Sequence, residues 1–152
     1  MIEVITFDLD DTLWDVRPAL SKAEAAQNLW LDTHYPKTLS ELGAEDLKRI
    51  RQHVLTREPQ LAHRISAFRQ TVLQQSLEET GLATAEAEWA AKEAFGAFIA
   101  RRHDVALYPE SLPLLEELAQ DYILGALTNG NADVTKTPLG RFFDFALKAE
   151  DV

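Results

Sequence analysis

Two short apolar runs, each followed directly by a polar loop, stand more than a hundred residues apart in this chain. Residues 2–7 lead into Asp8-Leu9-Asp10-Asp11-Thr12, and residues 122–127 lead into Thr128-Asn129-Gly130-Asn131. Val/Ile-rich runs are typical of buried parallel strands, and reactive groups in open α/β sheets lie just beyond the carboxyl ends of such strands. The pattern predicts an α/β fold in which the two polar loops converge.

The sequence between the two loops has the apolar spacing of amphipathic helices. We expect four of them: near residues 18–32, from after Gly43 to before Pro59, from about residue 60 to a C-cap at Gly81, and from after Thr84 through Arg102. Short connections allow such helices to bury their apolar stripes against one another, so they form a compact bundle. A further helix through residues 112–118 precedes the second strand, and residues 142–147 are expected to form a third strand.

These elements predict two domains. An α/β core comprises residues 1–16 and 105–152, and a helical domain of residues 17–104 is inserted within it. Both are expected to fold, since a chain of 152 residues with 46% hydrophobic residues can build a sizeable core.

Charge and composition exclude several classes of partner. The net charge of −10 disfavours binding to nucleic acid or to anionic lipid, both of which need clustered Lys and Arg. No cysteine is present, so disulfides and thiolate chemistry are excluded. The first residues lack the basic start of a secretory signal, and no apolar stretch approaches the roughly 20 residues of a membrane span. We therefore expect a soluble, cytoplasmic protein, with its oligomeric state left open.

The paired acids of the first loop suit covalent catalysis. The Asp8 carboxylate can attack phosphorus to form an acyl-phosphate, and Asp10 can protonate the leaving group and later activate water. Mg²⁺ beside Asp8 would offset repulsion from an incoming phosphate. Thr128 and Asn129 can donate hydrogen bonds to phosphate oxygens.

Each loop also has a purely structural interpretation. Asp11 or Thr12 could cap a helix, because Asp and Thr favour N-caps and turns. Asn129-Gly130 is by itself a strong turn signal. The two interpretations stay open for both loops at this point.

The order and separation of these motifs resemble the haloacid dehalogenase-like hydrolases that carry a helical cap after their first motif. The resemblance rests on residues 8–13, the helical insert, Tyr108-Pro109 and residues 127–130. The resemblance implies a Rossmann-like core with Asp8 as nucleophile and Asp10 as acid/base. It also implies that Mg²⁺ is bound by the Asp8 carboxylate and the Asp10 main-chain carbonyl. Thr128 and Asn129 would then bind the phosphate of a small phosphorylated metabolite.

The longer strings at residues 7–14 and 124–134 resemble the flavin-pathway branch, whose members dephosphorylate FMN or 5-amino-6-(5-phospho-D-ribitylamino)uracil. The second acid argues against the dehalogenase branch, because displacing halide needs no proton on a leaving oxygen. Transfer of the phosphoryl group to a sugar hydroxyl, as in the related mutases, is an alternative.

The family pattern continues to a phosphate-stabilising Lys and a further acidic pair, which this sequence does not match. Lys136 and Lys148 stand elsewhere and are expected to be surface charges. We therefore expect the core to be interrupted after its third strand, and an alternative function is an inactive fragment that binds phosphate or another chain through an exposed strand. Other residues are given structural roles: Trp14 in the core and, on a solvated helix face, His53, His63, Arg64 and Arg69.

Overall fold

The computed structural model describes residues 1–152, which divide into two compact units. Met1–Lys22 with Arg102–Val152 form the sheet unit, and Ala23–Arg101 form the helical unit. The predicted domain boundaries, after residue 16 and before residue 105, stay a prediction. Each unit is described below by itself.

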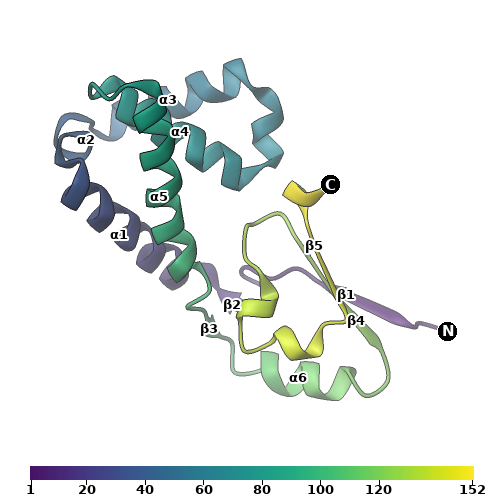
Figure 1. The fold of residues 1–152 in the computed structure, drawn as a ribbon. Helices are drawn as coiled ribbons and strands as arrows, with labels where there is room; N and C mark the ends of the chain where they lie inside the picture. The colour runs from purple at the N-terminus through teal and green to yellow at the C-terminus, as the bar shows by residue number, and fades with distance from the viewer. The chain divides into compact units, whose positions relative to one another are not determined.

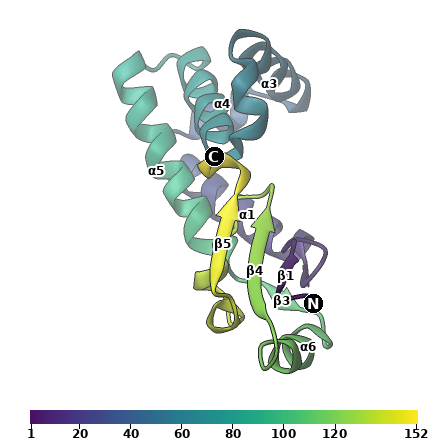
Figure 2. The ribbon, with the colours of Figure 1, turned by 90° about the vertical axis from the view of Figure 1, so that its right-hand side faces the viewer.

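The sheet unit contains three parallel strands in the order β1-β4-β5. They are β1 (Val4–Phe7), β4 (Ile123–Thr128) and β5 (Phe145–Lys148), and Figure 2 shows β4 beside β5. The register pairs Phe7 with Ala126, so the ends of β1 and β4 lie at the same edge. The predicted α/β fold with a parallel sheet and an inserted helical bundle is confirmed.

One face of this sheet carries the core. Leu124 and Ala126 of β4 pack there with Leu115 of α6 (Ser111–Leu118), with Leu9 of the first polar loop and with Ala132, which follows the second, forming one buried apolar cluster. The opposite face exposes apolar side chains from all three strands: Val4, Ile123, Leu127, Phe145 and Leu147. The expectation that the first strand is buried is therefore wrong for this face, because a parallel strand is buried only where both faces are covered.

A second, two-stranded sheet was not predicted. β2 (Trp14–Asp15) pairs antiparallel with β3 (Ala106–Leu107), and the Leu13 carbonyl also accepts a hydrogen bond from the Ser111 hydroxyl at 2.7 Å. Strands of two residues are too short to show an alternating pattern. This small sheet ties together the two stretches of chain that lead into and out of the helical unit (Figure 1).

The helical unit contains five helices where four were predicted. They are α1 (Val16–His34, which begins in the sheet unit), α2 (Pro36–Glu41), α3 (Ala44–Arg57), α4 (Ile65–Glu79) and α5 (Thr84–Arg102, whose last residue belongs to the sheet unit). No helix was expected between residue 32 and Gly43, which is wrong, because Pro36 begins α2 rather than only ending the helix before it.

Other boundaries shift by a few residues. The third predicted helix begins at Ile65 after a separate 3₁₀ turn (Pro59–His63), and another 3₁₀ turn (Gly140–Phe142) delays the third strand to Phe145.

The predicted glycine C-cap of α4 is confirmed in detail. Gly81 has φ 105°, in the left-handed region that favours glycine. Its N–H donates to the Glu78 carbonyl at 3.0 Å, and the Leu82 N–H donates to the Leu77 carbonyl at 3.1 Å. These two bonds are those of a Schellman motif, which satisfies carbonyls at a helix end.

None of the helices combines the length and the apolar character that crossing a bilayer would require.

Candidate active site

The acidic loop after β1 is held as a tight turn by two buried leucines. Leu9 and Leu13 lie in the core, and the Leu13 N–H donates to the Leu9 carbonyl at 2.9 Å. The Asp11 N–H donates to the Trp14 carbonyl at 2.8 Å, and Asp11 has φ 58°. A left-handed Asp is tolerated because its short polar side chain bonds locally. The alternation of buried Leu with exposed or half-exposed Asp directs the carboxylates away from the core.

The three aspartates of the loop have different surroundings. The Asp11 carboxylate accepts the N–H of Val16, the first residue of α1, at 3.0 Å, so the helix-capping interpretation holds for this residue. Asp8 is exposed and lines a hollow at the carboxyl edge of the sheet. Asp10 is half-buried and makes side-chain contacts of its own. Asp11 therefore caps α1, whereas Asp8 and Asp10 do not.

Asp8 shares its hollow with the residues predicted to bind phosphate. The hollow has a volume of about 530 Å³ and is lined by Asp8, Leu127, Thr128, Asn129, Leu147, Lys148, Ala149 and Val152. Thr128 is buried and Asn129 exposed at the end of β4. The structure thus brings Asp8, Thr128 and Asn129 together on one concave surface, because the parallel strands β1 and β4 end at the same edge.

Lys148 differs from its predicted role as a surface charge. Its side chain is half-buried and lines the same hollow, where its ammonium lies 3.6 Å from a Glu150 carboxylate oxygen and 3.7 Å from one of Asp151. Its position at the end of β5, in register with Thr128, explains the placement. The hollow therefore holds a cation already paired with carboxylates. Lys136 does lie at the surface, 3.9 Å from Asp133.

Asp10 is fixed by a buried arginine that sequence reasoning did not identify as a site residue. Arg102 is 1% exposed, and its Nη2 donates to Asp10 Oδ2 at 2.5 Å while its Nε donates to Asn131 Oδ1 at 2.9 Å. The Trp14 indole Nε1 donates to the other Asp10 oxygen at 2.8 Å. Trp14 is the core residue that was predicted, and it is also a donor to the site.

One signal for Arg102 was present in the sequence. It stands four residues after Phe98 and eight after Ala94, both of which are fully buried in the structure, so it continues an apolar helix face. A buried arginine needs a carboxylate partner. The Nη1 of Arg102 is buried without any hydrogen-bond partner, which adds to the cost of holding this side chain beside Asp10.

Gly130 lets the second loop approach the first. A Cβ atom added to Gly130 would lie 2.7 Å from Asp10 Oδ2, closer than such atoms normally come, and 3.4 Å from the Thr128 hydroxyl. The Gly130 N–H also donates to the Thr128 hydroxyl at 3.0 Å. The Asn129-Gly130 turn is therefore part of the candidate site, because the lack of a side chain at Gly130 leaves space for the Asp10 carboxylate.

A magnesium ion fits the donors near Asp8 only in part. The structure contains no group of three or more Asp, Glu, His or Cys side chains placed to hold a metal. The Asp10 carboxylate is engaged by Arg102 and Trp14, which leaves the Asp8 carboxylate and the Asp10 main-chain carbonyl as donors. Mg²⁺ commonly binds through one or two carboxylates and keeps several waters, so these two oxygens are compatible with it.

Comparisons with known proteins agree on the family. A model of haloacid dehalogenase-like hydrolases matches residues 2–152. The chain is 34% identical over 148 residues to 5-amino-6-(5-phospho-D-ribitylamino)uracil phosphatase YigB of Escherichia coli K12, covering 97% of this chain and 62% of that protein.

Solved structures show the same likeness. The 2-haloacid dehalogenase of Pseudomonas syringae pv. tomato is 48% identical with a TM-score of 0.93, covering 99% of this chain and 65% of that one. The HAD-hydrolase YfnB of Bacillus subtilis shares the fold at 20% identity with a TM-score of 0.59, covering 99% and 66%. The chain thus spans slightly less than two thirds of the length of these relatives.

Proposed function

We propose that this chain, which belongs to the haloacid dehalogenase-like hydrolase family, carries the two catalytic carboxylates of a magnesium-dependent phosphomonoesterase. The support is local geometry together with the likeness to a phosphatase. Asp8 lines a hollow with Thr128 and Asn129, and Asp10 is held beside Thr128 across Gly130. A nucleophile, a proton-transfer group and phosphate-binding donors are therefore gathered at the end of one sheet.

The reaction would proceed in two steps. An Asp8 carboxylate oxygen attacks the phosphorus, the bond from phosphorus to the ester oxygen breaks, and Asp10 delivers a proton to the leaving alcohol. A water molecule then attacks the phosphorus of the acyl-phosphate, giving its proton to Asp10 and releasing inorganic phosphate and the free Asp8 carboxylate. Thr128 and Asn129 donate hydrogen bonds to the phosphate oxygens in both steps. Bound Mg²⁺ would neutralise charge between Asp8 and the phosphate.

The observation that carries the proposal is the fixed orientation of Asp10. Donors from Trp14 and Arg102 occupy one lone pair on each of its oxygens, so the carboxyl group cannot rotate freely. A hydrolase that displaces halide has no leaving oxygen to protonate and gains nothing from a second positioned carboxylate. Phosphate ester cleavage uses both acids.

The comparisons favour two candidate substrates. The likeness to YigB points to 5-amino-6-(5-phospho-D-ribitylamino)uracil, which is the phosphorylated metabolite we propose. The greater identity to a protein described as a 2-haloacid dehalogenase makes dehalogenation the second candidate. That reaction would use Asp8 as the nucleophile on carbon and release halide, and it would leave Asp10 dispensable.

Release of phosphate and of halide by the purified chain separates these candidates. p-Nitrophenyl phosphate and 5-amino-6-(5-phospho-D-ribitylamino)uracil are tested with Mg²⁺, and 2-chloropropionate is tested in parallel. We expect phosphate release that Asp8→Asn abolishes and that the exposed control Asp121→Asn leaves unchanged. Chloride release that survives Asp10→Asn, with no phosphate release from either ester, would overturn the phosphatase proposal.

A further inference from the structure

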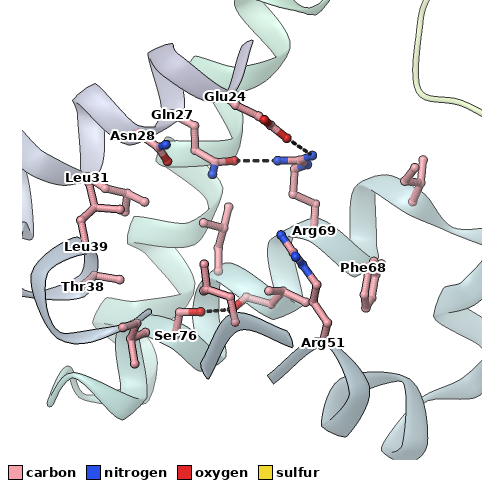
Figure 3. Close-up of a pocket in the computed structure, with 15 residues that line it drawn as sticks. Glu24, Gln27, Asn28, Leu31, Thr38, Leu39, Arg51, Phe68, Arg69 and Ser76 are labelled. Atoms are coloured by element: carbon pink, nitrogen blue, oxygen red, sulfur yellow. Dashed lines mark hydrogen bonds and ion pairs between the residues drawn. The ribbon is translucent and has the colours of Figure 1, made fainter. Parts of the chain in front are cut away.

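The helical unit encloses a second hollow, remote in sequence from the residues of the candidate active site. It has a volume of about 410 Å³ and lies among α1, α2, α3 and α4 (Figure 3). Small-molecule sites typically have volumes of about 300–1,000 Å³ and apolar walls with a few polar groups. This hollow matches that description, since its apolar lining is Leu31, Leu39, Leu42, Leu47, Ile65, Phe68, Val72 and Leu73.

One amide in this lining has a donor that no protein group accepts. Gln27 is 8% exposed, and its carbonyl oxygen accepts a hydrogen bond from Arg69 Nη1 at 3.4 Å. The amide nitrogen of Gln27 donates to no group of the protein, and Figure 3 shows it turned away from Arg69 toward the apolar side chains. This nitrogen is not fully buried, so it is able to donate to water or to a polar atom of a bound molecule.

Two arginines line the same hollow. Arg69 was predicted to lie on a solvated helix face, which is wrong: its guanidinium lies 3.4 Å from a Glu24 carboxylate oxygen and 4.0 Å from the centre of the Phe98 ring. Arg51 makes no hydrogen bond or ion pair, and Figure 3 shows its guanidinium directed toward that of Arg69. Arg51 therefore brings to the hollow a positive charge that no carboxylate of the protein pairs with, although the net charge of the chain is −10.

We propose that this hollow binds a small organic anion with an apolar body. The apolar body packs against the leucines and Phe68, the anionic group pairs with Arg51, and the Gln27 amide donates to a polar atom of the body. Guanidinium groups recognise carboxylates and phosphates through paired hydrogen bonds, so both anions have the required chemistry. The proposal rests on the helical unit alone and does not depend on the proposed phosphatase activity.

Ligand-observed and ¹⁵N-edited NMR titrations of the whole chain test the proposal. The probes are phenylacetate, phenyl phosphate and inorganic phosphate. We expect at least one aromatic anion to shift the side-chain amide signals of Gln27, while inorganic phosphate does not, since it lacks an apolar body. Binding of phenylacetate identifies a carboxylate ligand, and binding of phenyl phosphate alone identifies a phosphate ester.

A matched pair of variants on α3 supplies the control. Arg51→Gln should weaken binding about tenfold, the loss expected for one charge-assisted hydrogen bond. Arg57→Gln removes an exposed arginine of the same helix that lies outside this hollow, and it should leave affinity unchanged. Leu39→Trp, at an exposed lining position, should fill the hollow and abolish binding while circular dichroism shows an intact fold.

Three results would overturn the proposal. They are the absence of binding by both aromatic anions, an affinity that Arg51→Gln and Arg57→Gln change equally, and chemical shift changes confined to the sheet unit. Because Arg51 is exposed and unpaired, its replacement is not expected to disturb folding, and the comparison remains valid without a stability correction.

Discussion

Replacing Arg102 by Met tests whether this arginine holds Asp10 in place. The change removes the 2.5 Å bond to Asp10 and the 2.9 Å bond to Asn131 but keeps most of the apolar stem. A hydrogen bond that involves a charged group contributes about 1.5–3 kcal/mol, and both of these bonds are donated by the charged guanidinium. Met also removes the buried, unpartnered Nη1 of Arg102, which recovers about 1–3 kcal/mol.

The expected net loss is about 2.5 kcal/mol, which lowers Tm by roughly 5–10 °C for a chain of this size. Differential scanning calorimetry of wild type, Arg102→Met, Asp10→Asn and the double variant measures both the loss and the coupling. Because the two side chains are in contact, the double variant should lose about 1 kcal/mol less than the sum of the single losses. Strictly additive losses, or an unchanged Tm in Arg102→Met, would refute the assignment of Arg102 as the residue that positions Asp10.

Three further predictions follow from particular contacts. Gly130→Ala places a methyl group 2.7 Å from Asp10 Oδ2, so it should lower kcat for p-nitrophenyl phosphate roughly 100-fold through misplacement of this carboxylate, with the fold intact by circular dichroism. Gly81→Ala should lower the free energy of unfolding by about 1 kcal/mol because φ there is 105°, whereas Gly96→Ala in the open middle of α5 should raise it by about 0.5–1 kcal/mol. The hydroxyl and N–H of Thr135 hold the pKa of Asp133 below its ordinary value of 3.8. The stabilisation that the Asp133 carboxylate provides is therefore complete above about pH 3.8 and is lost as the pH falls through the folded pKa. The difference in Tm between wild type and Asp133→Asn should shrink below about pH 4.

Convergence of the two polar loops could be predicted from sequence because it depends only on topology. Parallel strands end at a common edge, so once residues 2–7 and 122–127 are interpreted as neighbouring strands, Asp8 and Thr128 must approach each other. The C-cap at Gly81 was predictable for a similar reason, since a glycine at the end of an apolar helical stripe has a local function. Both predictions required only nearby residues or a general rule of sheet geometry.

Arg102 could not be paired with Asp10 in the same way. The two residues are 92 positions apart, and no periodicity relates the last turn of a helix to a particular strand end. Pro36 illustrates a different difficulty, because proline both disfavours helix in the residue before it and favours the first position of a new helix. The short strands β2 and β3 are specified by pairing with each other rather than by their own composition.

A phosphorylated Asp8 is the most direct test of the proposed function. p-Nitrophenolate leaves readily without a proton, so Asp10→Asn should still transfer the phosphoryl group from p-nitrophenyl phosphate to Asp8 but should hydrolyse the acyl-phosphate slowly. Mass spectrometry of the rapidly quenched Asp10→Asn variant should then find one phosphoryl group on the peptide that contains Asp8, and none in the Asp8→Asn, Asp10→Asn double variant. A chain that releases phosphate from this ester without ever carrying the label on Asp8 would contradict the account.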